Sequence, residues 1–411
     1  MKTTQEINNR IRSGEATVIP APEFKKRIRD GETFTVEDVD VVTCGTFGVM
    51  SGTYAVLTVP VAPPGTFRKA SSLFLNGVPA YPGPCPNERL GLIDCIVYGT
   101  AHRDDHYGGG HLFADLAAGK TIEIEAEADG RRYTNDITLS DCGFAKLHTT
   151  RSAFKNYTAF LRREEGVLET IFSVTGLHGS CREISVSGCG EVNPLQNDPS
   201  LRSLAPGTPV LVNGVNGIIT GTGTRSTAER PNLACSADIN GMDPLMMGGF
   251  ITSDGPECLT SVAAAIPVLD TVSLESLMVL DEEIPLPVAD ISNRQPIGES
   301  DYGRIWRGTD RGVRIHPKRC QDCTPCTARS ICPAEAIGEG HTIDYSLCLA
   351  CGACASVCEK RVFSINLGTL DIFGNEIPVT LRQSDRTRAE RLCRHLADRI
   401  REGCFFLREG P

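Results

Sequence analysis

Two runs of cysteines between Cys320 and Cys358 constrain this chain more than any other feature of its sequence. The first reads C-x2-C-x2-C-x5-C-P and the second C-x2-C-x2-C-x3-C. This spacing is typical of bacterial two-cluster ferredoxins, in which the fourth cysteine of each run ligates the cluster of the other run. The crossed pattern predicts two 4Fe-4S clusters, one on each of these sets: Cys320, Cys323, Cys326 and Cys358; Cys348, Cys351, Cys354 and Cys332.

Zinc and disulfides explain the two runs less well. A zinc site needs only four thiolates, usually as two separated pairs. Disulfides belong mainly to secreted chains. The runs depart from the usual pattern in two ways: Glu359 follows Cys358 where proline is usual, and five residues instead of three precede Cys332. Two clusters imply that the chain transfers electrons.

The length of 411 residues predicts two or three domains. We expect an α+β protein. Its large mixed α/β domain with many short strands would span residues 1–295, a ferredoxin-like domain 296–365, and a C-terminal extension 366–411. The Pro-rich segment 284–296 is the expected linker, and residues 154–164 are an expected helix.

The amphipathic helix expected in the extension begins after Ser384 and stops near Gly403. Its apolar face would carry Ala389, Leu392, Leu396 and Ile400. Its arginine face, which includes Arg386 and Arg394, is expected to be solvated.

Charge and hydropathy narrow the classes of partner. The net charge of −10 argues against a general nucleic-acid binder, because phosphate contacts depend on Lys and Arg. The N-terminus lacks the apolar stretch of a signal peptide. The sequence contains no run of 18 apolar residues, so it predicts no membrane span. We therefore expect a soluble, cytoplasmic protein in a reducing interior, with a homodimer as the default assembly.

Four cysteines outside the runs lie in segments rich in glycine or proline. They are Cys44, Cys85, Cys189 and Cys258. A turn exposes both a thiol and backbone N–H groups, which stabilise the thiolate that a nucleophile or persulfide carrier requires. The alternative is structural, since free cysteine is among the most buried residue types.

The segment HRDDHYGGGHLFADLAAGK offers a second candidate site. Gly108, Gly109 and Gly110 run into an expected helix start, where free N–H groups favour an anion. His106 or His111 would then act as general acid toward a carbonyl oxygen. A metal site on the histidines and an ordinary turn are the alternatives. Further along, Arg225 is a candidate anion clamp.

Several long segments carry a family resemblance. They are DVVTCGTFGVMSG, NGVPAYPG, YGGGHLFADLAAGK, GEVNPLQNDP and AIPVLD. Over residues 5–285 the chain resembles the homocysteine-biosynthesis family, which includes archaeal aspartate-semialdehyde sulfurtransferases. With both cysteine runs attached, it resembles the methanogenesis marker 16 metalloproteins. The resemblance implies that a persulfide delivers sulfur to a small anionic aldehyde. Electrons from an external donor such as a ferredoxin then reduce the product to a thiol.

The chain departs from this pattern at the implied catalytic cysteines. Ser51 stands where the family carries one cysteine, and residues 130–133 lack another. Cys44 is the candidate for the first role, and Cys85, Cys189 or Cys258 for the second. The resemblance implies sulfoacetaldehyde as substrate and coenzyme M as product. The alternatives are homocysteine formation from aspartate semialdehyde, a cluster that itself carries the sulfur, and a non-enzymatic electron-transfer or assembly factor.

Overall fold

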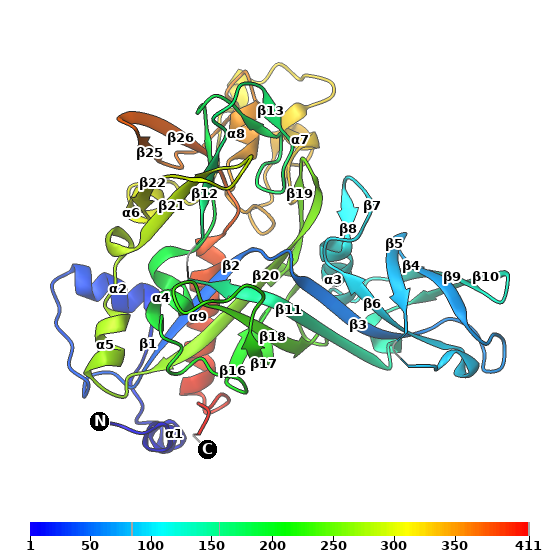
Figure 1. The fold of residues 1–411 in the computed structure, drawn as a ribbon, viewed down its shortest axis with the longest axis horizontal. Coiled ribbons are helices and arrows are strands. Elements are labelled where there is room, and N and C mark those ends of the chain that lie inside the picture. Colours follow the sequence, from blue (N-terminus) through cyan, green and yellow to red (C-terminus); the bar gives the residue numbers. More distant parts are fainter. Residues whose placement is uncertain (84, 156, 410–411) are drawn as a thin grey trace.

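The computed structural model describes residues 1–83, 85–155 and 157–409. It is a mixed α/β fold in which strands dominate (Figure 1). The main sheet has the strand order β1-β2-β20-β16-β17-β18-β11-β3-β6-β5-β4-β9-β10, and β19 pairs with β20. Its strands are β1 Val18–Pro20, β2 Val41–Val49, β3 Thr53–Pro60, β4 Ala70–Leu75, β5 Val78–Pro82, β6 Leu92–Tyr98, β9 Ile122–Ala128, β10 Arg131–Ile137, β11 Phe144–Phe154, β16 Pro209–Val212, β17 Val215–Thr222, β18 Asn232–Asp238, β19 Gly248–Thr252 and β20 Gly255–Pro267.

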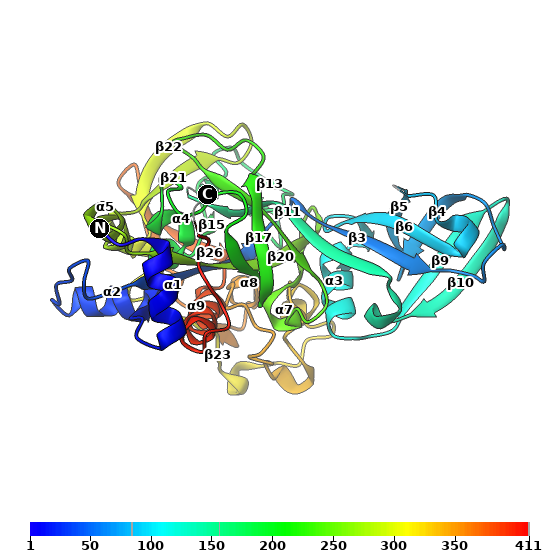
Figure 2. The same cartoon turned by 90° about the horizontal axis from the view of Figure 1, so that it is seen from below.

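One end of this sheet projects from the rest of the molecule. Strands β4, β5, β6, β9 and β10 form this arm, which extends to the right in Figures 1 and 2. Strand β9 reads IEIEAEA, and its apolar residues are buried while its glutamates are not. This period of two is that of a strand with one face on a core. Helix α3, Gly109–Ala117, lies where the arm joins the body.

A second sheet combines strands from before and after the cysteine runs. Its order is β22-β21-β12-β15-β26-β25, with β22 Pro296–Asp301, β21 Pro285–Asp290, β12 Ala159–Leu161, β15 Ile184–Val186, β26 Asn375–Arg382 and β25 Thr369–Ile372. The expected linker 284–296 is therefore wrong, since this segment contains strand β21 and the first residue of β22, both inside the second sheet. The expected helix at 154–164 is also wrong, because these residues include β12 and the end of β11. Small pairs complete the strands: β7 His102–Asp104 with β8 Tyr107–Gly108, β13 Val167–Leu168 with β14 Leu177–His178, and β23 Arg314–Ile315 with β24 Phe363–Ser364.

The remaining helices are short except for α9. They are α1 Thr4–Ser13, α2 Ala21–Arg29, α4 Pro194–Asn197, α5 Thr271–Leu277, α6 Gly303–Trp306, α7 Thr327–Ser330, α8 Ala353–Val357 and α9 Arg386–Arg401. Thr3 and Glu6 form a capping box that starts α1. Among the described residues, no helix combines the length and the hydrophobicity needed to cross a membrane.

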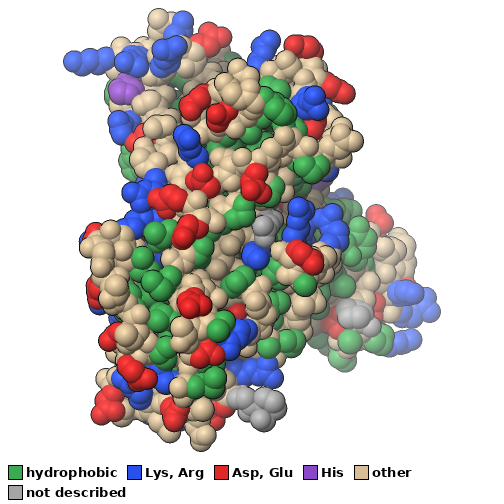
Figure 3. Space-filling view, turned by 60° about the vertical axis from the view of Figure 1, so that its left-hand side comes forward, with side chains coloured by type: hydrophobic (Ala, Val, Ile, Leu, Met, Phe, Trp, Pro, Cys, Tyr) green, Lys and Arg blue, Asp and Glu red, His purple; other side chains and the backbone are tan. Residues whose placement is uncertain are grey.

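Helix α9 confirms the predicted C-terminal helix, with two differences. Its N-cap is Asp385, whose side chain accepts a hydrogen bond from the N–H of Arg388, so Ser384 is not the cap. The expected apolar face is buried against β2 and β20. Arg386 is buried too, so the solvated-face prediction is wrong at that position, although Arg394 is exposed. The face drawn in Figure 3 mixes charges of both signs.

Candidate functional site

The structure brings the eight cysteines of the two runs together around two cavities. Four of them line a cavity of about 310 Å³: Cys320, Cys323, Cys326 and Cys358, here called the outer quartet. The other four line a smaller cavity: Cys332, Cys348, Cys351 and Cys354, here called the inner quartet. These are the two sets that the crossed spacing predicts. The clusters themselves stay a prediction.

The surroundings of the thiols suit an iron–sulfur cluster. Backbone N–H groups donate to sulfur in both quartets: Asp322 to Cys320 at 3.3 Å, and Ala350 to Cys348 at 3.4 Å. Such bonds favour the thiolate form that ligates iron. Gly352 adopts φ +96° immediately before α8, a left-handed turn that suits glycine and lies between Cys351 and Cys354. The residues present therefore fit a cluster at each cavity.

The two quartets differ in where they face. Cys351 is 8% exposed and packs with Leu349 and Ala353 in the main hydrophobic core. Its carbonyl accepts a hydrogen bond from the N–H of Arg382 at 2.9 Å. In the outer quartet, Cys323 is exposed. The inner quartet thus adjoins the main domain, and the outer quartet lies toward solvent.

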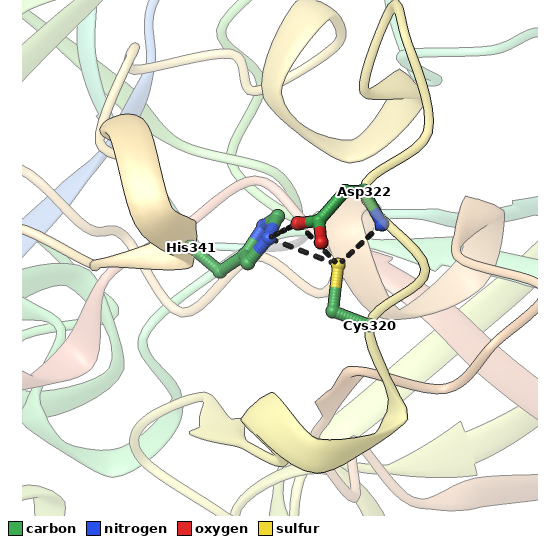
Figure 4. Close-up of side chains that lie close together, drawn as sticks. All are labelled: Cys320, Asp322 and His341. Atoms are coloured by element: carbon green, nitrogen blue, oxygen red, sulfur yellow. Dashed lines mark hydrogen bonds and ion pairs between the residues drawn. The ribbon is translucent and has the colours of Figure 1, made fainter.

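A polar group contacts one sulfur of the outer quartet (Figure 4). His341 places Nε2 at 2.9 Å from Sγ of Cys320 and at 3.1 Å from Oδ1 of Asp322. The carboxylate and the thiol sulfur lie on the same side of the imidazole, so both contact the same ring nitrogen. Hydrogen bonds to sulfur ligands are among the factors that set a cluster's reduction potential.

A large cavity of about 720 Å³ is lined by residues of both sheets. Four arginines line it, together with aromatic rings and small polar residues; the arginines are Arg151, Arg225, Arg230 and Arg294. Among the other lining residues are Ser51, Ser187 and Gln383. Gln383 directly follows Arg382, whose N–H binds the carbonyl of Cys351. This space, here called the arginine cavity, therefore borders the strand end that contacts the inner quartet.

The glycine loop before α3 does not provide the predicted anion site. The N–H of Gly108 binds Nδ1 of His111 at 3.2 Å, that of Gly109 binds the carbonyl of Ala101 at 2.7 Å, and that of Gly110 binds the carbonyl of Gly99 at 3.1 Å. These N–H groups are already used. The glycines serve close packing instead, because a Cβ on Gly110 would overlap the carbonyl oxygen of Gly248. The prediction for Gly108, Gly109 and Gly110 is therefore wrong, although the helix start there is confirmed.

His111 lines a cavity of about 220 Å³ between α3 and the loop that carries the inner quartet. Leu347 and Leu349 form the facing wall. Burial lowers the pKa of His111 to about 4, so its imidazole is neutral at pH 7. Because Nδ1 accepts a hydrogen bond from Gly108, the proton must sit on Nε2, which has no partner among the described residues. His106 is exposed and lines a different cavity, beside Cys323 and Cys326.

The four candidate cysteines do not meet at one cavity. Cys44 lies in the middle of β2 and Cys258 within β20, so the turns predicted for them are wrong. Burial raises the pKa of Cys44 to about 12 and also raises that of Cys258. Cys85 is exposed, and its pKa is raised by a hydrogen bond to Asp94.

Of the four candidate cysteines, Cys189 is closest along the chain to a residue that lines the arginine cavity, since Ser187 lies two positions before it. It is buried, its Sγ lies 3.5 Å from the carbonyl oxygen of Phe47, and burial raises its pKa to about 11. The roles of all four cysteines remain predictions.

The sequence interpretation missed Arg151, Arg294 and Glu257. Burial raises the pKa of Glu257 to about 7, and its carboxylate bonds to Ser51 at the edge of the arginine cavity. Arg225, predicted as an anion clamp, does lie in this cavity. No local signal marked the other three, because they come together only through the main sheet and the loop between β21 and β22.

Comparisons with known proteins agree over nearly the whole chain. Residues 16–407 match the family described as "Homocysteine biosynthesis enzyme, sulfur-incorporation". An uncharacterized protein of Methanothermobacter thermautotrophicus is 45% identical over 406 residues, which cover 98% of this chain and 94% of that protein. Another uncharacterized protein, from Methanocaldococcus jannaschii, is 39% identical over 394 residues, which cover 95% of this chain and 99% of that protein.

The L-aspartate semialdehyde sulfurtransferase of M. jannaschii is 30% identical over 334 residues, which cover 75% of this chain and 63% of that enzyme. No solved structure matches the chain significantly. The chain belongs to the homocysteine biosynthesis, sulfur-incorporation family of enzymes.

Proposed function

We propose that this chain is an iron–sulfur sulfurtransferase that inserts sulfur into a small anionic aldehyde and yields a thiol. The grouping of the eight cysteines into two quartets with N–H donors on their sulfurs carries the iron–sulfur part of the proposal. The family description, and relatives named L-aspartate semialdehyde sulfurtransferase, support the sulfur-transfer part.

The reaction needs an electron source. When the sulfur is at the oxidation level of sulfide, one aldehyde, one hydrogen sulfide, two electrons and two protons give one thiol and one water. The carbonyl C–O bond breaks, a C–S bond forms, and the oxygen leaves as water. A persulfide donor carries sulfur two electrons more oxidised, so it requires two further electrons and two protons. Bound clusters would supply these electrons singly, from an external carrier of the ferredoxin class.

The placement of the quartets suggests the direction of electron flow. The exposed Cys323 makes the outer quartet the accessible entry, and the buried Cys351 brings the inner quartet against the main domain. On the inner side the chain offers the neutral donor His111 in one cavity and four guanidinium groups in another. Either can orient a carbonyl or an anion without supplying electrons itself.

Two acceptors are proposed. Aspartate semialdehyde, which would give homocysteine, is the acceptor in the names of the sulfurtransferase relatives. Sulfoacetaldehyde, which would give coenzyme M, is the second candidate. The four arginines of the arginine cavity favour it, because they suit a sulfonate and no lining Asp or Glu in the described part offers a partner for an ammonium group.

The test is an anaerobic assay of the full chain with reconstituted iron and sulfide. The protein, sulfide and a low-potential reductant are mixed with each aldehyde, and thiol product is measured by mass spectrometry. We expect product from at least one aldehyde, and none from Cys351→Ser. Absence of product from both, at full iron loading, would refute the enzyme and favour the electron-transfer or assembly alternative. Product formation undiminished in Cys351→Ser would instead remove the clusters from the mechanism.

A further inference from the structure

The arginine cavity gathers four positive charges, and the acidic neighbour named above, Glu257, contacts its lining at Ser51. None of Arg151, Arg225, Arg230 and Arg294 forms an ion pair or a side-chain hydrogen bond within residues 1–83, 85–155 and 157–409. None of the cavity's lining residues in those ranges is an Asp or a Glu. Nε of Arg151 is buried without any partner among them. Arg225, Arg230 and Arg294 are exposed and Arg151 is half-buried. A buried guanidinium nitrogen that lacks an acceptor is costly, so the site favours an anion from outside the chain.

Aromatic rings hold two of these arginines. The guanidinium carbon of Arg151 lies 4.2 Å from the ring centre of Phe154. That of Arg294 lies 4.4 Å from the centre of Phe160 and 4.8 Å from that of Phe172. A guanidinium stacked on a ring keeps its N–H groups free at its edge, where they form paired hydrogen bonds to a carboxylate, sulfonate or phosphate.

The arginines also crowd each other. Burial, and then the charge of Arg225, lower the pKa of both Arg151 and Arg294. Mutual repulsion of this kind is relieved when an oxyanion enters between the groups. An ammonium group would meet the same repulsion, and the unpartnered buried acceptors among the lining residues that the structure describes are both neutral: Oδ1 of Asn232 and the hydroxyl of Tyr157.

We infer that the arginine cavity binds a small molecule that carries an oxyanion and no ammonium group. This rests on the proposed function only where it identifies that molecule as the aldehyde acceptor. Two neighbours support the identification. Ser51, at the position where the resembling family carries a cysteine, lines the cavity, and Gln383 lies one residue from the backbone contact to Cys351. The bound anion would then lie in a cavity that contains Ser51 and that adjoins, through Gln383, the backbone contact to the inner quartet.

Binding of unreactive alcohol analogues to the full chain tests the inference. The probes are 2-hydroxyethanesulfonate, which has an oxyanion alone, and L-homoserine, which adds an ammonium group; both are titrated by calorimetry. We expect the sulfonate to bind more tightly, by about tenfold or more, because both probes offer an oxyanion to the arginines but the ammonium group of homoserine would lose its water without gaining a charged acceptor. Arg151→Gln and Arg294→Gln should each weaken the sulfonate by about tenfold. Arg131→Gln, at an exposed arginine of β10 on the distant arm, is the matched control and should change nothing.

Each other result has a definite meaning. Homoserine binding as tightly as the sulfonate overturns the exclusion of ammonium, and sulfonate binding that neither arginine variant weakens overturns the site. No binding of either probe also overturns it, provided that circular dichroism shows a folded protein. Sulfonate binding that depends on Arg151, without thiol formation, leaves the site standing and refutes the proposed function. Thiol formation with an unchanged KM in Arg151→Gln supports the proposed function and refutes the arginine cavity as the binding site of the aldehyde.

Discussion

Replacing Arg386 by methionine should destabilise the protein more than any other single change in α9. This side chain is 4% exposed and lies in the first turn of the helix. Its Nη1 donates to Oδ2 of Asp281 at 2.5 Å, and its Nη2 donates to Oε1 of Glu191 at 2.7 Å. Both carboxylates are almost fully buried as well, so methionine would leave buried negative charge without its partner.

The size of the effect follows from what remains after the change. Removing one partner of a buried ion pair costs about 3–5 kcal/mol. Glu191 keeps two hydrogen bonds from Arg29, at 2.7 and 2.5 Å, whereas Asp281 lies 4.0 Å from that arginine. Asp281 keeps the backbone N–H of Glu191 at 2.9 Å but loses its closest cation. One carboxylate rather than two therefore loses its ion pair, and we expect a loss near the lower end, about 3 kcal/mol.

Urea unfolding followed by circular dichroism measures this loss. Arg394→Met is the control, because Arg394 lies in the same helix, is exposed, and approaches Glu390 only at 3.7 Å. Such a surface pair contributes about 0–1 kcal/mol. If Arg386→Met loses no more stability than Arg394→Met, the buried network does not stabilise the attachment of α9.

The same variant has a pH signature with a fixed sign. Burial alone would raise the pKa of Glu191, but the hydrogen bond from Arg29 and the charge of Arg386 lower it to about 2. Its ionised form therefore contributes stability above the unfolded pKa of about 4.3, and this contribution is lost as the pH falls toward 2. Arg386→Met removes part of that contribution, so the gap between wild type and variant should narrow between pH 5 and pH 2. A constant gap would contradict the assignment.

Three further outcomes are expected. Cys351→Ser should lower the iron content of reconstituted protein by about half, because only the inner set is broken; iron analysis measures this, and an unchanged content would contradict a cluster on the inner quartet. Burial lowers the pKa of His111 to about 4, below its unfolded value. The free energy of unfolding of the wild type should therefore fall by about 3 kcal/mol between pH 6.5 and pH 4. Urea titrations should show no such fall in His111→Gln. Gly249→Ala should destabilise by about 1–3 kcal/mol in thermal melts, because its Cβ would overlap the His111 ring, whereas Gly221→Ala meets nothing within 4 Å and serves as control.

Local spacing was sufficient to predict some features and not others. The apolar face of α9 follows from a short period in the sequence, since residues three or four positions apart on a helix face the same way. The cysteine sets follow from the spacing of the two runs and the crossed pattern of ferredoxins. The turn predicted at Cys44 fails because Gly45 and Gly48 have a long-range purpose. A Cβ on Gly45 would lie 2.7 Å from the carbonyl oxygen of Ala389, so these glycines let α9 pack directly on β2. No local pattern distinguishes such a glycine from one that forms a turn.

The arginine cavity was hidden for a related reason. Arg151 belongs to β11, and Arg294 follows β21. Only the folded sheets bring these two positions to one space. The sequence singled out Arg225 because it follows a glycine-rich segment. That segment is strand β17, and it does not form a binding loop. Arg225 becomes a candidate binding residue because other arginines lie near it in the folded protein, and these arginines are far from it in the sequence.

Residues 382–388 connect the features on which the proposed function depends. The N–H of Arg382 binds the carbonyl of Cys351, and Gln383 lines the arginine cavity. Arg386 is anchored to the buried carboxylates, and Arg388 donates to the carbonyl of Ser346, two residues before Cys348. The inner quartet and the arginine cavity are therefore held by one continuous stretch of chain, so a shift of α9 would move both together. The region that carries the cysteine runs therefore packs on the rest of the chain through these contacts. It also gives Arg386→Met a second readout, since loosening α9 should weaken anion binding at the cavity without any change to its arginines.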